Sequence, residues 1–562
     1  MIKRLVVDGV DTLLAPTTGP TQAGLAFRVG FADEPLARRG ITHLIEHLAL
    51  HSVGITDYHY NGATGIEFTF FHMQGAEHEI VAFLNGVCAS LRNLPMQRLA
   101  VEKDLLQAEA NGRSQGVADQ MALWRHGALD YGTVSYPEWG LPAITADHLR
   151  SWVDRYFTRE NAVLWVAGDA VPEDLRLDLP SGVRQPTPAP SSALPETPAY
   201  FCGSAGGVVW DSVLPRSAAT WVYTAVLERM LFRELRQEAG LSYTVQTDYQ
   251  PFSTDSVIVT AVADALPEKQ GAVVGGFVDV LATLRAGRID PADVTAVVNK
   301  RVDAMQHADD VGARLPGQAF GLLVGREVQD VEQMIADVRA VTVADVAKVA
   351  AAAWPAGLMM SPARGEWAGF TLAPSRSESA VAGVSFVSLE NPSETLVVGP
   401  AGVSLVEGGQ ILTVRHQDCV IVRAWPDGGR QFVGADGIVV WIEPTLFADG
   451  HTAVPAIDAG VRAEVRVDQP ARDPERIPKP QPHVPPLGAA TTEDRVVGMA
   501  GLLFWWPVSL FFGAIAALLF ISLTTDTEEA GLIIAVALMC LGVTALGGYF
   551  IRRSARRRRF GR

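Results

Sequence analysis

The sequence predicts an α+β protein whose first two thirds form two similar halves with antiparallel sheets. The first observation is an alternation of strand-like and helical runs before residue 179. Strands are predicted at 24–31, 66–72 and 161–166, and helices at 40–50, 79–92, 98–111 and 145–156. The second observation is that a similar order resumes after residue 198, with strands at 205–210, 242–249 and 255–263 and helices at 218–237, 268–284 and 291–307. Such self-similarity indicates an internal duplication.

A third observation separates the rest of the chain from the halves. Between about residues 385 and 469, short alternating runs are broken by glycines and by Pro-Asp-Gly, which is typical of a small antiparallel β module. Its composition loosely resembles that of a pleckstrin-homology-like domain. The predicted organisation is a first half at 1–178, a Pro-rich linker at 179–198, a second half at 199–372, the β module at 385–467, a Pro-rich spacer at 468–495, apolar segments at 496–523 and 530–551, and a basic tail at 552–562.

The two apolar segments near the end of the chain are each long enough to cross a bilayer as a helix. A short acidic stretch, "TTDTEE", separates them, and arginines follow the second. Because positive residues favour the cytoplasmic side, the pattern predicts a transmembrane hairpin with the tail and the large N-terminal region in the cytoplasm. The expected location is therefore the cell membrane, as a multi-pass protein. The alternative is a pair of buried core helices.

Composition excludes several classes of protein. Apolar residues make up 48% of the chain and charged residues 19%, which is enough apolar surface for real cores and argues against disorder. The net charge of -16 argues against nucleic acid as a partner, because such proteins present a basic face. The four cysteines lie far apart, which is typical of reduced thiols inside a cell. The N-terminus has no apolar segment of the kind that a signal peptide requires.

The stretch "HLIEH" carries the strongest chemical signal. Positions i, i+3 and i+4 share one face of a helix, so His43, Glu46 and His47 point the same way. Two imidazoles one turn apart can hold a zinc ion, and the glutamate beside them can take a proton from water. This order is that of the inverzincin peptidases. The alternative is an amphipathic helix with a histidine-rich polar face. His51 is either a rival ligand or, as we prefer, a helix-terminal histidine.

The surrounding motifs make the chain resemble the pitrilysin or insulinase family of zinc peptidases, which includes the mitochondrial processing peptidases. "FADEPLARRGITHLIEHLAL" is similar to the opening of that family, and "NGATGIEFTFF" to its Asn-Ala-x-Thr turn, with Gly62 in place of the alanine. "VEKDLLQAE" is similar to its third-ligand helix. The resemblance implies that Glu109 is the third zinc ligand, that Glu102 orients the site, and that Asn61 holds the substrate.

The resemblance extends into the second half. "LFRELRQEAGLSYTV" matches an Arg–Tyr pair of the family, here Arg236 and Tyr243, which would contact the substrate and stabilise the oxyanion. The family works as a chamber of four α+β domains and this chain supplies two, so the resemblance implies a homodimer or a heterodimer with a related subunit. Between His51 and Tyr60 the chain is shorter than the family pattern, which alters the cleft wall beside the zinc.

Together these features predict a membrane-tethered zinc metalloendopeptidase in which Glu46 is the catalytic base. Its substrates would be peptides or unfolded segments, laid along the edge of the strand expected at 65–71. The alternative is a catalytically silent relative that serves as a peptide-binding or assembly scaffold.

Overall fold

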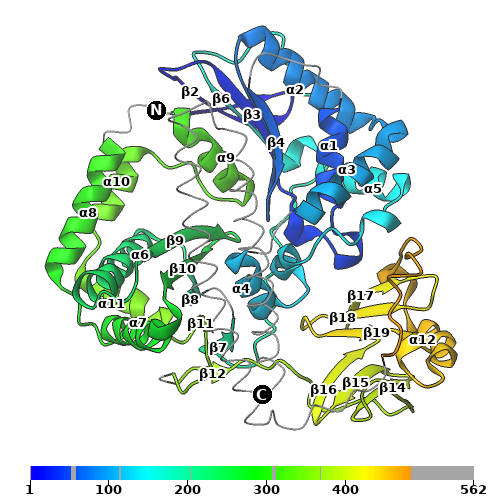
Figure 1. Cartoon of the computed structure of the whole chain (residues 1–562). Helices are drawn as coiled ribbons and strands as arrows, with labels where there is room; N and C mark the ends of the chain where they lie inside the picture. Colours follow the sequence, from blue (N-terminus) through cyan, green and yellow to red (C-terminus); the bar gives the residue numbers. More distant parts are fainter. Residues whose placement is uncertain are drawn as a thin grey trace, which may run out of the picture. The chain divides into compact units, whose positions relative to one another are not determined.

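The computed structural model describes residues 2–51, 59–112, 116–203, 206–306, 312–367 and 369–481 (Figure 1). One compact unit comprises Met1–Ser388 and Pro392–Lys479. The second unit, Leu389–Asn391 with Pro480–Arg562, lies almost wholly outside the described residues. The class is mixed α+β, as predicted, with two six-stranded and two four-stranded sheets in the described part of the chain.

The first half is a six-stranded sheet with helices on one face. The strands run in the order β1-β2-β6-β3-β5-β4. Their bounds are β1 Lys3–Val7, β2 Val10–Ala15, β3 Gln22–Phe27, β4 Tyr60–Thr64, β5 Thr69–Gln74 and β6 Ala162–Ala167. The longer helices are α1 Ile41–Leu50, α2 Glu77–Arg92, α3 Leu99–Gly112, α4 Val117–His126 and α5 Ala146–Tyr156. In Figure 1 α1 and α2 lie beside the strands of this sheet.

The period-two alternation of the strands gives this sheet two buried faces. Leu25 and Phe27 of β3 pack with helix α1 in the main core of the half, whereas Ala26 faces the opposite side. That opposite face is covered by a helix of the second half, α9 Leu315–Leu323. A Cβ at Gly24 would lie 2.6 Å from the Trp165 ring, so glycine lets neighbouring strands β3 and β6 accommodate this indole.

The second half repeats the architecture of the first. Its sheet has the order β12-β7-β11-β8-β10-β9. The strands are β7 Ala199–Cys202, β8 Gly207–Pro215, β9 Val245–Phe252, β10 Ser256–Asp264, β11 Gly357–Ser361 and β12 Thr371–Leu372. The helices are α6 Ala218–Leu231, α7 Gln270–Arg285, α8 Pro291–Gln306, α9, α10 Val331–Arg339 and α11 Val343–Ala353.

The pairing scheme of the two halves matches for five of the six strands in each sheet. In each sheet a parallel pair, β2 with β6 or β7 with β11, is followed by three antiparallel neighbours. The sixth strand differs: β1 precedes its neighbour in the chain and pairs antiparallel with β2, whereas β12 follows the rest of its sheet and pairs parallel with β7. The strand order thus agrees with the duplication that the sequence indicated.

The β module consists of two four-stranded sheets. One has the order β13-β14-β15-β16 and the other β19-β18-β17-β20. The bounds are β13 Val384–Val387, β14 Glu394–Gly399, β15 Gly402–Glu407, β16 Gln410–Arg415, β17 Cys419–Ala424, β18 Arg430–Gly434, β19 Val439–Ile442 and β20 Arg466–Asp468, with helix α12 at Val454–Gly460. Residues of both sheets and α12 share one apolar core.

The predicted membrane location needs correction. Within the part of the chain that the structure describes, no helix combines the length and the apolar character needed to cross a bilayer. Helices α2, α7 and α8 have 16 residues each, against about 20 for a span. Segments 496–523 and 530–551, on which the prediction depended, lie outside the described residues. The assignment as a multi-pass cell-membrane protein with a cytoplasmic N-terminal region is therefore withdrawn.

Candidate metal centre

Helix α1 begins at a fixed position because an acidic side chain caps it. Glu34 accepts hydrogen bonds from the backbone N–H of Gly40 at 3.0 Å and of Thr42 at 2.8 Å, and it pairs with Arg39 at 2.9 Å. A carboxylate at a helix N-terminus satisfies otherwise unpaired N–H groups and the positive end of the dipole. Gly40 has φ +102°, a conformation that favours glycine. The Asp-Glu-Pro and Arg-Arg-Gly segments thereby fix where the histidine helix starts.

His43, His47 and Glu109 converge on one point between helices α1 and α3. Glu109 carboxylate oxygens lie 4.0 Å from His43 Nε2 and 3.8 Å from His47 Nε2. The three ligand atoms lie within 4.8 Å of one another, which makes this a candidate metal group among the described residues. Zinc bonds of 2.0–2.2 Å in a tetrahedron place ligand atoms about 3.4 Å apart, so the three groups fit a zinc ion with small adjustments. His51 is the C-terminal cap of α1 and stands outside the group.

The two imidazoles are oriented by carboxylates on their far side. His43 Nδ1 donates to Glu138 Oε1 at 2.7 Å, and His47 Nδ1 lies 3.4 Å from Glu102 Oε2. Arg98 holds the other oxygen of Glu102 at 3.0 Å. Because a carboxylate accepts, these contacts favour protonated Nδ1 and leave each Nε2 lone pair facing Glu109. This is the arrangement that metal-binding histidines commonly show.

Glu138 is a site residue that sequence reasoning missed. It lies 95 positions from His43, so no helical or strand spacing connects them. It is buried, and its Cβ approaches within 3.0 Å of the position that a Cβ on Gly40 would take. The only available signal was its place in "YPEWGLP", a segment similar to the end of the first domain in the pitrilysin family.

Glu46 lies next to the ligand group, with its carboxylate buried. Thr64 donates a hydrogen bond to Glu46 Oε2 at 2.7 Å. Burial raises the pKa of Glu46, while the neighbouring His43 and the Thr64 hydrogen bond act in the opposite direction. A Cβ on Gly62 would lie 3.0 Å from Glu46 Oε1, so the glycine gives this oxygen room. Both oxygens thus face residues 60–64: Oε2 accepts from Thr64, and Oε1 lies beside Gly62.

Asn61 lies in β4, an outer strand of the sheet. Sequence reasoning had expected the free edge at the strand 65–71 instead. The strand expected at 65–71 was predicted to have a free edge, but β5 pairs with β3 on one side and β4 on the other. Residues 61–64 read as a turn, yet they form most of β4, and the turn follows at Gly65, whose N–H donates to the Phe68 carbonyl at 2.8 Å. The outer strand of the sheet is therefore β4, which carries Asn61 opposite His72.

Arg236 and Tyr243 pair with each other rather than with the metal group. The Arg236 guanidinium lies 4.8 Å from the Tyr243 ring centroid, and Tyr243 is 77% exposed. Both precede β9. The opposite end of β9 leads to Ser253, whose N–H donates to Glu67 of the first half at 2.7 Å. The eight residues of β9 span roughly 25 Å, so the structure places the pair at the far end of the strand from this contact.

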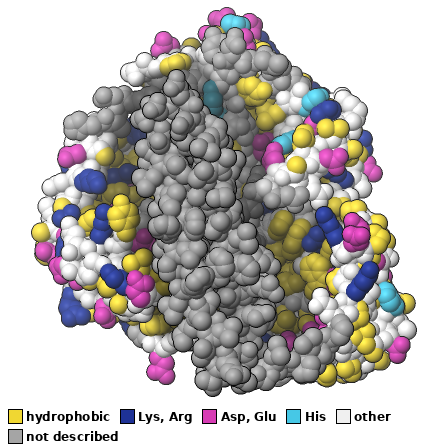
Figure 2. Space-filling view, in the orientation of Figure 1, with side chains coloured by type: hydrophobic (Ala, Val, Ile, Leu, Met, Phe, Trp, Pro, Cys, Tyr) yellow, Lys and Arg dark blue, Asp and Glu magenta, His cyan; other side chains and the backbone are white. Residues whose placement is uncertain are grey.

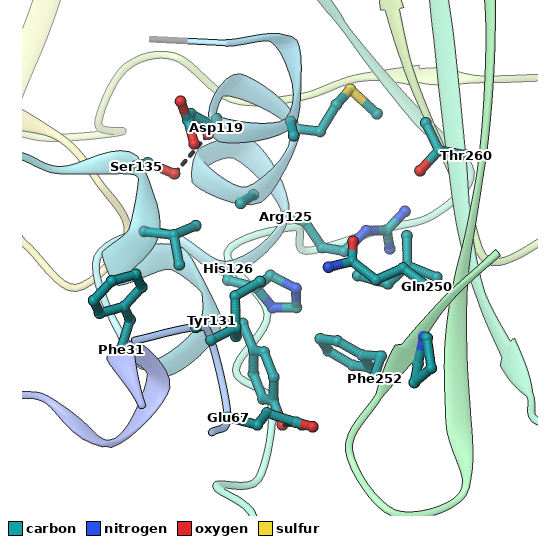
Figure 3. A pocket seen from close by; sticks show the side chains of 18 of the residues that line it. Phe31, Glu67, Asp119, Arg125, His126, Tyr131, Ser135, Gln250, Phe252 and Thr260 are labelled. Carbon is teal, nitrogen blue, oxygen red and sulfur yellow. Dashed lines mark hydrogen bonds between the residues drawn. The ribbon is translucent and has the colours of Figure 1, made fainter. Parts of the chain in front are cut away.

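A cavity of about 1180 Å³ is lined by residues of both halves, among them Glu138, which hydrogen-bonds His43. Glu138 lines it, as do Gly65, which follows the edge strand, and Ala110, which follows Glu109. Figure 3 shows a wall in which Tyr131 and Phe252 lie side by side, with ring centroids 4.2 Å apart. The cavity therefore borders the metal group through Glu138, the residue that orients His43.

The surface shows no single field of charge on the face in view. Figure 2 shows Lys and Arg side chains scattered among Asp and Glu over the described residues.

Comparison with known proteins gives structural neighbours only. No family model and no curated protein matches the sequence. A protease from Helicobacter pylori aligns with a TM-score of 0.54 at 16% identity, covering 64% of this chain and 98% of that one. The peptidase M16 inactive domain from Pseudomonas fluorescens gives 0.53 at 14% identity, covering 64% and 97%.

A longer neighbour matches only in part. The periplasmic protease PqqL from Escherichia coli gives a TM-score of 0.55 at 12% identity, and the match covers 72% of this chain and 55% of that one. This chain thus spans about half the length of that enzyme. Likeness at these identities concerns the fold: the two halves have the pitrilysin-like fold of the M16 peptidases.

Proposed function

We propose that the protein is a zinc metallopeptidase that hydrolyses peptides or unfolded segments. The observation that carries the proposal is the convergence of His43, His47 and Glu109 beside the buried carboxylate of Glu46. Helix α1 supplies the two imidazoles and the base, and the separate helix α3 supplies the carboxylate ligand. The fold brings these two helices together. The M16-like fold supports the same class of reaction.

The donor set suits zinc, since it combines two neutral imidazole nitrogens and one carboxylate and leaves a coordination position open. When bound by His43, His47 and Glu109, zinc would supply a Lewis acid that polarises a peptide carbonyl and lowers the pKa of water. Glu46 takes up a proton at Oε1, because Oε2 is engaged by Thr64. A raised pKa makes Glu46 a stronger base and lets it pass the proton on to the departing amine.

The peptide would bind in extended form along β4. This strand is the outer member of the sheet, and Thr64 at its end contacts Glu46. Strand addition uses main-chain hydrogen bonds, which suit unfolded substrates of varied sequence. Asn61 would hold the substrate backbone at the start of the same strand. Side chains of the peptide would then extend into the cavity lined by Tyr131 and Phe252.

A second subunit completes the proposed enzyme. Arg236 and Tyr243 lie at the end of β9 opposite the contact with the first half, which favours their action in trans. The proposed assembly is a homodimer or a heterodimer with a related chain, in which the pair of one subunit faces the metal group of the other. There the guanidinium and phenol would stabilise the oxyanion of the tetrahedral intermediate.

The direct test compares the wild-type protein with Glu46→Gln. Zinc-loaded wild-type protein is expected to cleave an unfolded peptide, and the variant to lose this activity by a factor of at least about 10² while binding zinc equally well. Zinc content measured on the same samples shows that the ligands remain intact. Undiminished cleavage by zinc-loaded Glu46→Gln would remove Glu46 from the mechanism.

The second candidate is a peptide-binding or assembly scaffold with a silent centre. It is favoured by the stacking of Arg236 on Tyr243, which engages the two residues with each other, and one structural neighbour is described as an inactive domain. Against it, the ligand group is complete. Stoichiometric zinc in a protein that binds unfolded peptides without cleaving them, alone or with a partner chain, would decide for the scaffold.

A further inference from the structure

The β module packs on the part of the first half that supports the metal centre. Strand β17 lies against the turn Leu36–Arg38, which immediately precedes helix α1, and β20 lies against Leu141–Ala143, which follows Glu138. Apolar residues of both parts share one cluster. Its buried members are Leu36, Ala37, Ala128 and Tyr136 of the first half and Ile421, Val433 and Val467 of the module.

The backbones also meet closely at this interface. The N–H of Ala128 donates to the carbonyl of Ala435 at 3.0 Å. Gly127 has φ +68°, and a Cβ there would lie 2.2 Å from the same carbonyl oxygen. Any residue larger than glycine would force the two segments apart. The backbones of the first half and of the β module therefore approach each other as closely as neighbouring backbones within one domain.

Two aromatic residues beside Glu138 are held by the module. Tyr136 is buried, and its hydroxyl lies 3.5 Å from the position that a Cβ on Gly437 would take. The Arg423 guanidinium stacks on Trp139, 4.7 Å from the ring centroid. Burial lowers the pKa of Arg423 to about 10, which agrees with a cation enclosed between side chains. Glu138 thus sits between two residues that the module fixes.

Glu138 in turn orients a proposed ligand. Its Oε1 accepts the Nδ1–H of His43 at 2.7 Å, which turns Nε2 toward Glu109. We propose that the β module is a structural part of the metal centre, and that Arg423 is a positioning residue that acts on His43 through Trp139 and Glu138. The inference rests on the proposed metal site and goes beyond it, because the module lies outside the segment that resembles the pitrilysin family.

The test measures zinc affinity in full-length variants by competition with a chromophoric chelator. Loss of an outer-shell partner typically weakens metal affinity 10–100-fold, so we expect about tenfold weaker binding in Arg423→Ala and at least that in Glu138→Gln. Arg423→Lys keeps the charge but not the planar stacking and should fall between. The visible absorption of the cobalt-substituted protein should change in Arg423→Ala, because the ligand geometry changes.

A double-mutant cycle separates positioning from general stability. If Arg423 acts through Glu138, the double variant binds zinc no more weakly than Glu138→Gln alone. The matched control is Arg415→Ala, in strand β16 of the other sheet of the module, which should bind zinc like the wild type. Additive losses in the double variant, or equal losses in Arg415→Ala, would overturn the inference. So would wild-type affinity in Arg423→Ala. A wild-type protein that binds no zinc would instead refute the proposed function itself.

Discussion

Replacing Gly62 by alanine tests how closely the edge strand approaches the proposed base. The added Cβ would lie 2.9 Å from Leu50 Cδ1 and 3.0 Å from both Cγ and Oε1 of Glu46. Leu50 can yield, because the contact is at the end of a flexible side chain. Glu46 is less free, since Thr64 holds its other oxygen at 2.7 Å. The variant should therefore displace the carboxylate of Glu46.

The size of the effect follows from the distances. Ordinary contact begins at 3.4 Å, so a contact at 3.0 Å requires the carboxylate to withdraw by about 0.4 Å. A misplacement of 1 Å can cost about 10²-fold in rate, so we expect roughly a five- to tenfold lower kcat. Zinc affinity should stay unchanged, because the three atoms nearest to the added methyl group belong to Leu50 and Glu46 and not to a proposed ligand.

The assay is steady-state cleavage of an unfolded fluorogenic peptide, with zinc content measured in parallel. Gly86→Ala is the matched control, since a Cβ there meets nothing within 4 Å. In the resembling family an alanine stands at the position of Gly62. An unchanged or higher kcat in Gly62→Ala would refute the placement of Glu46 against β4.

Three further predictions follow from the geometry. Arg125 forms a buried ion pair with Asp211 of the other half, so Arg125→Ala should lower the free energy of unfolding by about 3–5 kcal/mol in chemical denaturation. The control Arg150→Ala breaks an exposed ion pair and should lower it by less than about 1 kcal/mol. Equal effects of the two variants would contradict a buried ion pair between the halves. Cys202 is exposed, whereas burial raises the pKa of Cys88 to about 12. Only pH values near 12 would generate the Cys88 thiolate, so between pH 7 and 9 a thiol reagent should modify Cys202 first, as peptide mass mapping would show. Finally, a chelator should abolish peptide cleavage and added zinc should restore it, whereas activity that survives complete metal removal would exclude the proposed mechanism.

Local patterns predicted the histidine helix well. Its periodicity and the i, i+3, i+4 spacing depend only on neighbouring residues, and α1 spans Ile41–Leu50 as expected. The meeting of Glu109 with His43 and His47 depended on a resemblance, because nothing in the spacing ties two separate helices together. The mixed α+β class came from periodicity and was confirmed by the four sheets.

Contacts between distant segments were not predictable. Glu138 joins His43 across 95 positions, and the docking of the β module depends on surfaces that composition does not reveal. Residues 61–64 were read as a turn because they resemble the Asn-Ala-x-Thr turn of the pitrilysin family, yet they pair with β5 as a strand. Contacts between distant segments also place helix α9 of the second half on the sheet of the first, where its apolar residues share a core with the strands.

The repeated strand order bears on how the two copies have diverged. Helices α1 and α6 hold equivalent places in their halves, each preceding the outer strand, β4 or β9. The first carries the histidines of the proposed metal site, while the second continues as a π-helix, Phe232–Glu238, that contains Arg236. Such wide turns are rare and concentrate at functional sites. The two equivalent helices therefore differ in backbone geometry: α1 stays a regular α-helix through its histidines, whereas the helix that begins as α6 widens where it carries Arg236.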